Sequence, residues 1–528
     1  MSPFFGLLGA VLLSVRVANA ASAYAPVEVT CPTDEALVRS ADSISTSESD
    51  YVTARKAVAD TNLLSWLTSV DDTYSSATTL PLVGLTTSGG GYRSLLSGAG
   101  VIQAFDSRDS SLSVAGIYQS LTYQGGLSGG SWLLSSIIGN NWTTISELRD
   151  NLWTTAFEET LIGYEGIGGE LKIKADITAK DDAGFDTTLT DPWGRLLSYQ
   201  LLEGSDGGVA TTLSGVADVS NFTSYGVPFP IITAIGVNAS TECAPGYDGT
   251  QYEFSPFEFG SWDSGFAAFT PTKYLGSNLT DGSGTCYERF DNLGFIFGTS
   301  SAVFAEVCSE TEGTASEFAE DLIAFYDGIH DISEPTDLYS IYPNPFRGYS
   351  GSSAISSDDD LYLVDGGLSE QNNPIWPFIQ DARAVDVLIV NDNSADTDDN
   401  WPNGTEIYHT YLRAQEVGLT LMPVIPDEDT FVSEGLNQSP TFFGCDTADT
   451  ITIVYLPNYN YTYDSNVATL QLAYSKSETD GIIANGNQIA SDGGDVAWAG
   501  CLACALMKKT GETLPDDCDT CFDDYCYN

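Results

Sequence analysis

The chain repeats one pattern of apolar and polar positions. An apolar run is followed by a glycine-rich turn and then by a helix or a polar loop, which predicts strands at 80–88, 117–124 and 361–364 and a further strand at 385–390. Helical spacing predicts a helical lead-in from 35 to 72 and an apolar helical run that ends at Phe105. Apolar strands that alternate with helices indicate an α/β fold with a mainly parallel sheet covered on both faces. Functional groups are then expected at the carboxyl ends of the strands.

A stretch at 251–269 is unusually aromatic, with seven Phe, Tyr and Trp residues. We interpret it as an ordinary packed insertion. The alternative is that these rings line or cap a site for an acyl chain.

The charge balance excludes one large class of function. The chain has 528 residues, of which 42% are hydrophobic, so it can bury a large core. It carries 73 Asp and Glu against 19 Lys and Arg, a formal net charge of −54. Such a surface repels nucleic-acid phosphates, so we expect no nucleic-acid partner. The charge suits acidic surroundings, although a demand for solubility would explain it equally well.

The first 20 residues have the features of a signal peptide. An apolar stretch runs from Phe4 to Val15, and Ala18-Asn19-Ala20 is a small-x-small cleavage pattern. We expect cleavage after Ala20, secretion to the extracellular space and no transmembrane segment in the mature chain. A membrane anchor is the alternative, because no Lys or Arg precedes the apolar stretch; that stretch is, however, too short to span a bilayer.

Ten cysteines fit an oxidising compartment. Five lie in the body and five in the tail at 501–526, so complete pairing requires at least one bridge between tail and body. Cys501-x-x-Cys504 and Cys518-x-x-Cys521 also resemble a zinc ribbon with a short interval. We expect disulfides, with no metal and no cofactor. Seven sequons predict glycosylation at Asn141, Asn221, Asn238, Asn278, Asn403, Asn437 and Asn460.

Ser128 is the candidate nucleophile. It lies in a Gly-x-Ser-x-Gly run at 126–130 between an expected strand and an expected helix, where a sharp turn would lift the hydroxyl clear of the backbone. In a chain so rich in Gly and Ser, about half a match arises by chance, so its position carries more weight than the pattern. The three glycines at 89–91 fit an oxyanion hole or, equally, a tight turn.

The general base is either a histidine or a carboxylate. The chain has two histidines, and the order Ser128, Asp365, His409 would suit a triad. His409 lies in ordinary secondary structure and His330 in a surface-like turn, so we expect neither to be catalytic. Asp365 follows a strand and precedes two glycines. An aspartate remains partly basic near pH 4, where an imidazole is protonated, and this favours Asp365.

Three spaced motifs carry a family resemblance. The runs at 88–93, 126–132 and 364–367 resemble, in that order, the fungal lysophospholipase and phospholipase B family. Its catalytic core is similar to those of cytosolic phospholipase A and, more remotely, patatin. The likeness covers roughly 31–526 and includes the runs at 297–301 and 394–404. It implies a three-layer α/β/α core, with 21–528 as one elaborated catalytic domain.

The resemblance also implies roles for individual residues. Ser128 would attack an ester carbonyl, Asp365 would take its proton, and the amides of Gly90 and Gly91 would hold the oxyanion. Arg93 matches a phosphate-recognising arginine, with a helix-surface arginine as the alternative. Phospholipids and lysophospholipids at micelle or membrane surfaces would be the substrates, and acyl transfer to a second lysophospholipid would accompany hydrolysis.

The sequence also allows two other interpretations of the function. One is a neutral-lipid esterase that uses Ser128, Asp365 and His409, and another is a noncatalytic surface glycoprotein. The acidic runs at 358–360 and 396–399 lack the spacing of an EF-hand, and we interpret them as solvated loops. The chain has no room for a calcium-binding membrane module. The sequence gives no oligomeric state.

Overall fold

A computed structural model describes residues 22–158, 160–161, 169–238, 244–305 and 335–527. The expected signal peptide, His330, Cys243 and Cys308 lie outside these residues. Within them, no helix is both long enough and apolar enough to cross a bilayer.

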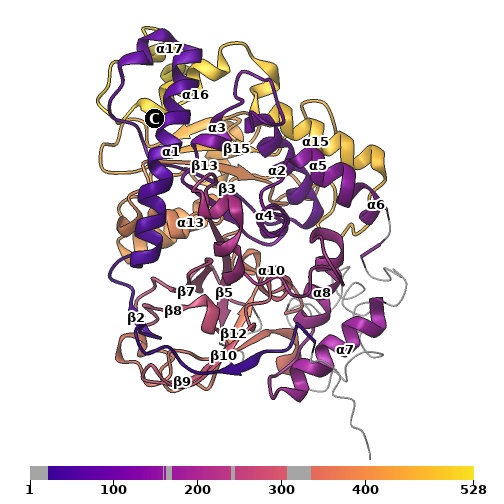
Figure 1. Cartoon of the computed structure of the whole chain (residues 1–528). Coiled ribbons are helices and arrows are strands. Elements are labelled where there is room, and N and C mark those ends of the chain that lie inside the picture. The colour runs from indigo at the N-terminus through magenta and orange to yellow at the C-terminus, as the bar shows by residue number, and fades with distance from the viewer. Residues whose placement is uncertain (1–21, 159, 162–168, 239–243, 306–334, 528) are drawn as a thin grey trace, which may run out of the picture.

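A large mixed sheet forms the centre of the described chain (Figure 1). Its path is β14-β15-β13-β3-β4-β5-β6-β7-β8-β2, with β12 attached to β5 and β11 attached to β12. A small antiparallel sheet has the order β1-β10-β9. The strands are β1 (Val27–Val29), β2 (Arg39–Ser40), β3 (Val83–Thr87), β4 (Tyr123–Gly126), β5 (Phe229–Val237), β6 (Thr250–Phe254), β7 (Glu258–Ser261), β8 (Ala268–Pro271), β9 (Asn278–Thr280), β10 (Ser283–Glu288), β11 (Ser340–Pro343), β12 (Asp360–Val364), β13 (Val387–Asp392), β14 (Thr441–Phe443) and β15 (Thr452–Pro457).

The central strands are parallel and the outer strands are antiparallel. Strands β15, β13, β3, β4 and β5 pair in parallel. Every residue of β3, β4 and β13 is buried, as expected for a sheet covered on both faces. The α/β class and the parallel centre are therefore confirmed. The antiparallel extension through β6, β7 and β8 was not anticipated, and β12 runs antiparallel to β5.

Helices cover both faces of the parallel strands and complete the three layers. Helices α2, α4 and α15 pack together on one face, while α1 lies on the opposite face. Tyr123 and Phe378 face the α1 side, where the Tyr123 hydroxyl donates a 2.9 Å hydrogen bond to Glu48 of α1. The helices are α1 (Thr46–Val70), α2 (Gly91–Phe105), α3 (Ile117–Ser120), α4 (Gly129–Gly139), α5 (Ile145–Leu148), α6 (Thr154–Ala156), α7 (Gly169–Asp182), α8 (Thr190–Leu201), α9 (Ser220–Thr223), α10 (Leu293–Ser300), α13 (Thr405–Val417), α14 (Glu428–Ser433), α15 (Lys476–Ala490), α16 (Trp498–Met507) and α17 (Cys518–Tyr525).

Two sequence-based boundaries were wrong. The expected strand 117–124 begins instead as the short helix α3, because Gly116 has a φ of 119° and the chain turns there before it enters β4. The lead-in helix begins at Thr46, well after residue 35. Ser45 caps it by accepting a hydrogen bond from the Glu48 amide, and the preceding Arg39–Ser40 pair joins the sheet as β2.

The aromatic stretch at 251–269 is a packed insertion, as expected. It forms β6, β7 and β8, and Tyr252, Phe254, Phe259 and Phe269 are buried. The rings of Tyr252 and Phe259 stack with centroids 5.4 Å apart.

Disulfides close the tail onto the body. The bridges between described cysteines are Cys31–Cys286, Cys445–Cys526, Cys501–Cys521 and Cys504–Cys518. The Cys445–Cys526 bridge is the expected link between tail and body. The four cysteines of the zinc-ribbon alternative are all paired in bridges, so the disulfide interpretation is confirmed. The Cys31–Cys286 and Cys445–Cys526 bridges join residues 255 and 81 positions apart. Bridges that close long loops restrict the unfolded chain.

Candidate active site

Ser128 lies at a strained turn between β4 and α4. Its φ is 50° and its ψ is −120°, a backbone conformation that is rare for a residue with a side chain. The next residues must be small, because a Cβ atom on Gly130 would lie 2.2 Å from the Thr87 carbonyl oxygen. The residue is 5% exposed. Ser128 is therefore buried at the carboxyl end of β4 and directly before a helix N-terminus, as the motif predicts.

The glycines at 89–91 lie against this turn. A Cβ on Gly129 would lie 2.0 Å from the Gly91 carbonyl oxygen, and a Cβ on Gly89 would lie 3.0 Å from Ser128 Cβ. Gly90 has a φ of 133° and caps α2, and Gly91 has a φ of 59°. Amides in the first turn of a helix have no partner within the helix. The first amides of α2 therefore lie beside Ser128, where they are available to an anion.

Asp365 reaches the same place from another strand. Strand β4 pairs with Phe229–Ile232 of β5, and β12 pairs with Ile235–Val237. Strand β6 occupies the other edge of β5 over Ile232–Gly236, so β4 and β12 lie end to end along one edge. They run towards each other. Their last residues pair with β5 positions that are three residues apart, so roughly 10 Å separates the two carboxyl ends. Ser128 follows the end of β4, and Asp365 follows the end of β12.

Side-chain and backbone contacts tie the two turns together. Asp365 is 3% exposed, and its Oδ1 accepts a 2.8 Å hydrogen bond from the Gly367 amide. A Cβ on Gly366 would lie 2.4 Å from Cδ1 of Leu127, the residue before Ser128. The loops that carry the expected nucleophile and the expected base are therefore in direct contact.

The end of α10 supports both turns. The Ser128 amide donates a 3.0 Å hydrogen bond to Ser300 Oγ, which itself donates to the Thr233 carbonyl of β5 at 2.6 Å. The Asp365 amide donates a 3.2 Å hydrogen bond to the Ala302 carbonyl. Ser301 Oγ accepts from Trp132 Nε1 at 2.9 Å. The run at 297–301, noted in the sequence without a role, thus fixes the backbone at Ser128, and the next residue, Ala302, fixes it at Asp365.

Asn372 holds the glycine turn, and sequence reasoning missed it. Its Nδ2 donates to the Gly89 carbonyl at 3.1 Å, and the Gly89 amide donates back to the Asn372 carbonyl at 3.1 Å. The Asn372 amide donates to Glu406 Oε2 at 2.6 Å. The available signal was a Gln-Asn-Asn run soon after Asp365, since a polar run that follows a buried strand needs buried partners.

Arg93 is buried beneath the glycine turn. It is 1% exposed, so it is not the helix-surface arginine of the sequence alternative. Its Nε donates to the Asn393 carbonyl at 2.8 Å, and its Nη1 donates to the Val467 carbonyl at 2.7 Å and to Thr469 Oγ1 at 3.0 Å. Its Nη2 lies 2.6 Å from the position that a Cβ on Gly90 would take. Burial lowers its pKa to about 10, which leaves the side chain charged at every relevant pH.

A cluster of carboxyl groups lies next to Arg93. Asp392 is fully buried and accepts hydrogen bonds from Tyr455 Oη and from Ser394. Burial and the nearby Asp392 raise the pKa of Asp396 to about 7. Burial and Asp396 raise the pKa of Glu406 well above its usual value. Asp396 is half-buried beside these two carboxyl groups, while Asp398 and Asp399 are exposed, so the interpretation of 396–399 as a solvated loop holds for the last two acids and only in part for Asp396.

The raised pKa of Asp396 predicts how stability depends on pH. The folded chain binds this proton more tightly than the unfolded chain, whose Asp pKa is about 4. The contribution of protonated Asp396 to the free energy of unfolding is fully present below about pH 4 and is lost as pH rises through about 7. Asp396→Asn should therefore reduce the fall in Tm between pH 4 and 7. The exposed Asp398→Asn, in the same loop, is the control; identical slopes in all three proteins would contradict the prediction.

His409 lies on α13 and has other partners. Its Nδ1 is 3.3 Å from both the carbonyl oxygen and Oε2 of Glu370. Its ring stacks on Tyr247 with centroids 5.4 Å apart. The expectation that it lies in regular secondary structure is confirmed.

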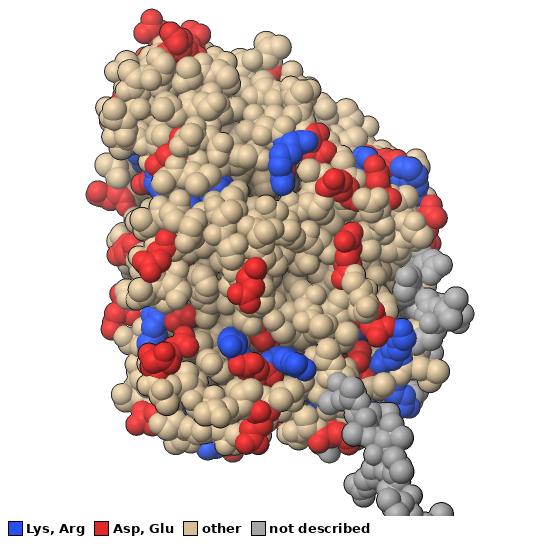
Figure 2. All heavy atoms as spheres, viewed as in Figure 1, with Lys and Arg blue, Asp and Glu red and all other residues tan. Residues whose placement is uncertain are grey.

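The seven sequon asparagines are all at least partly accessible. Asn437 is half-buried, and its Nδ2 donates to the Pro402 carbonyl at 3.1 Å. Acidic side chains are scattered over the visible face of the molecule and form no single patch (Figure 2).

Comparisons with known proteins find similarity over most of the chain. A family model described as the lysophospholipase catalytic domain matches residues 83–528. "Lysophospholipase 2" from Aspergillus fumigatus is 39% identical over 97% of this chain and 94% of its own length. A lysophospholipase from Penicillium chrysogenum is 39% identical over 97% of this chain and 91% of its own length. Human GIVD cytosolic phospholipase A2 has the same fold, with a TM-score of 0.70, 16% identity and coverage of 92% of this chain and 72% of that one.

Proposed function

The chain belongs to the lysophospholipase catalytic-domain family and is a lysophospholipase or phospholipase B hydrolase, and from this premise we propose that it is a secreted acyl hydrolase with a Ser128–Asp365 dyad. Its substrates are lysophospholipids and glycerophospholipids at micelle or membrane surfaces. One observation carries the proposal: β4 and β12 run end to end along β5 and bring Ser128 and Asp365 to one gap beside the glycine turn.

The reaction follows from the roles of these groups. Ser128 Oγ attacks the ester carbonyl while Asp365 takes its proton. The amides of Gly90 and Gly91 stabilise the negative charge on the carbonyl oxygen. The lysolipid or glycerol-phosphate alcohol leaves with the proton, and an acyl-enzyme remains on Ser128. Water then releases the fatty acid, or a second lysophospholipid accepts the acyl group in a transacylase reaction.

A carboxylate base fits acidic surroundings. An aspartate with an ordinary pKa near 4 still accepts a proton there, whereas a histidine would already be protonated. Bridges among the described cysteines and the net charge of −54 support secretion into such a compartment. We propose that residues 1–20 form the cleaved signal peptide, that 21–528 form one elaborated catalytic domain, and that the sequon asparagines carry glycans.

The direct test is fatty-acid release across pH from phosphatidylcholine, from its lyso form and from a neutral triacyl ester. The proposal predicts phospholipid hydrolysis with an optimum below pH 7. Hydrolysis of the neutral ester alone would favour the esterase alternative. Folded protein that fails to react with a fluorophosphonate would favour the noncatalytic glycoprotein.

We propose that Arg93 recognises the phosphate of the substrate through its charge. A guanidinium beside the glycine turn attracts a phosphate but has no partner in a neutral ester. Arg93→Gln keeps an N–H donor for the surrounding carbonyls while it removes the charge. We expect kcat/KM for lysophosphatidylcholine to fall about 10- to 100-fold more than kcat/KM for a neutral ester with the same acyl chain. Equal losses on both substrates would limit Arg93 to supporting the turn.

A further inference from the structure

A cavity lies away from the candidate active site, at the end of the molecule that contains β9 and β10 (Figure 1). Its volume is about 410 Å3, and its walls come from the β9–β10 hairpin, the segment after α7 and strands β11 and β12. None of the residues to which we assign a catalytic role lines it. The proposed hydrolysis therefore leaves this cavity without a role.

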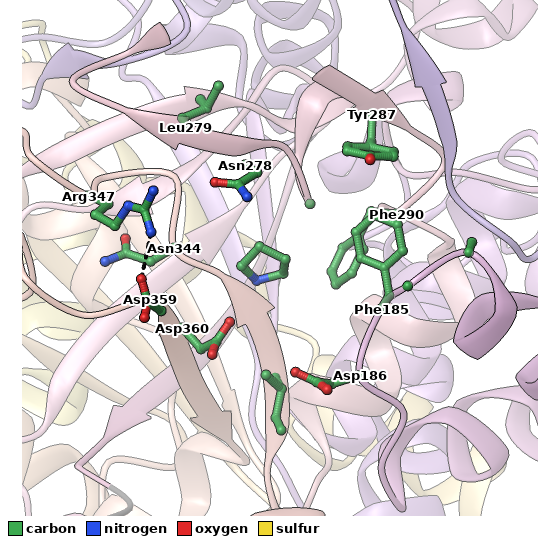
Figure 3. A pocket seen from close by; sticks show the side chains of 15 residues that line it. Phe185, Asp186, Asn278, Leu279, Tyr287, Phe290, Asn344, Arg347, Asp359 and Asp360 are labelled. Carbon is green, nitrogen blue, oxygen red and sulfur yellow. Dashed lines mark hydrogen bonds and ion pairs between the residues drawn. The ribbon is translucent and has the colours of Figure 1, made fainter. Parts of the chain in front are cut away.

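One wall of the cavity is aromatic. Phe185, Tyr287 and Phe290 lie together on one side (Figure 3). The Phe185 ring is 5.0 Å from that of Tyr287 and 5.4 Å from that of Phe290, between centroids. Phe185 and Phe290 are buried, whereas Tyr287 is half-buried. Such a wall offers a ring face to the apolar face of a bound molecule.

The opposite wall is polar and carries two carboxylates. Asn344, Arg347, Asp359 and Asp360 face the aromatic side, and Asp186 lies below Phe185 in Figure 3. Arg347 Nη1 is paired with Asp359 Oδ1 at 2.6 Å. Carboxylates therefore outnumber the single, already paired guanidinium, so a phosphate or another anion would be repelled. An acyl chain would leave these polar groups without partners. The two walls together suit a molecule with an apolar face and hydroxyl or amide edges, which is the chemistry of a sugar ring.

Asn278, a sequon asparagine, lines the same cavity. Residues 278–280 read Asn-Leu-Thr, and the Asn278 side chain is exposed. Among the described residues, the side-chain amide of Asn278 makes no hydrogen bond, so its Nδ2 is available for attachment of a glycan.

The sequon strand is fixed to the polar wall. Arg347 Nε and Nη2 donate to Thr280 Oγ1 at 3.1 and 2.8 Å, while Nη1 of the same side chain pairs with Asp359. Strand β9 also pairs with β10, which carries Tyr287. The attachment point therefore has a fixed position relative to both walls.

We propose that Asn278 carries an N-linked glycan whose first sugar residues lie in this cavity, against Tyr287 and Phe290. A ligand tethered at the rim has an effective concentration in the millimolar range, so weak stacking and hydrogen bonds suffice to hold it there. This tether favours the chain's own glycan over a free sugar or an organic cation. The inference rests on the proposed secretion, and it does not depend on which ester the enzyme cleaves.

The test uses the full chain secreted from a eukaryotic host. Peptide mass mapping measures glycan occupancy at each sequon, and an endoglycosidase that cuts within the chitobiose core is then applied to the native protein. We expect Asn278 to be occupied and its glycan to be removed about tenfold more slowly than the glycan at the exposed Asn460. Tyr287→Ser should abolish this protection, whereas Tyr287→Phe, which keeps the ring, should retain it. Lipid hydrolysis in the same preparations reports that the variants are folded.

Three outcomes would overturn the proposal. The first is an unoccupied Asn278 in a protein glycosylated elsewhere. The second is removal at the same rate from Asn278 and Asn460 with no effect of Tyr287→Ser. The third is saturable binding of tetramethylammonium to wild type and to Asn278→Gln alike, which would assign the cavity to a cation. A chain with no glycan at any sequon would contradict secretion as well, and hydrolysis would still be judged by its own assay.

Discussion

Replacement of Ser128 by Ala should lower fatty-acid release from lysophosphatidylcholine on the order of 10⁴-fold or more, to the level of background. The substitution removes the oxygen that forms the acyl-enzyme. It should also abolish covalent labelling by a fluorophosphonate, which reacts with an activated serine. Binding of the lipid should persist, because the glycine turn and its supports do not depend on Ser128 Oγ. Initial rates and intact mass after labelling measure the two effects.

Ser135→Ala is the matched control. Ser135 lies on the same helix α4, is fully buried, and its hydroxyl has no hydrogen-bond partner among the described residues. Its replacement should leave both the rate and the labelling close to those of wild type. Equal activity in Ser128→Ala and wild type would refute the assignment of the nucleophile. Persistent labelling of Ser128→Ala would show that another residue reacts.

Replacement of Asp365 by Asn should cost about 10³- to 10⁴-fold in kcat, whereas His409→Ala should change activity by no more than a few-fold. Asn keeps an oxygen that accepts the hydrogen bond from the Gly367 amide, so the turn after β12 is preserved. It cannot take the proton from Ser128 Oγ. His409 interacts with Glu370 and Tyr247, and its loss should affect mainly that surface contact.

The pair of variants decides between the dyad and the triad. Thermal unfolding of each variant checks that it is folded. A loss of similar size in both variants would favour a Ser128–Asp365–His409 triad. High activity in Asp365→Asn would remove the carboxylate from the reaction altogether.

Much of the candidate site can be predicted from the sequence because the constraints on its residues are local. A serine at a strained turn requires glycines around it, and a close approach of two backbones requires the glycines at 89–91; both leave a pattern in consecutive residues. The apolar strands at the centre are equally local, since β3 and β13 are buried along their whole length. The family resemblance then follows from three such patterns in a fixed order.

The sequence did not reveal the supports of the site, because their partners are far apart in the chain. Asn372 reaches Gly89 across 283 positions, and nothing near either residue marks the contact. Asp396 looks like one of several acids in a polar loop, and its raised pKa arises from burial and from the nearby Asp392. The direction of β12 was also hidden, because an apolar run is the same whether its strand lies parallel or antiparallel to its neighbour.

The sequence by itself therefore determined the family, the α/β class, the parallel centre and the residues at each sharp turn, because short-range sterics and hydrophobic periodicity fix these features. The tertiary structure alone decided that β12 meets β4 head-on along β5, that the end of α10 and Asn372 hold the turns, and that Arg93 is buried among carbonyl and carboxyl groups. These features depend on which distant segments share an edge or a face, and no local pattern encodes that choice.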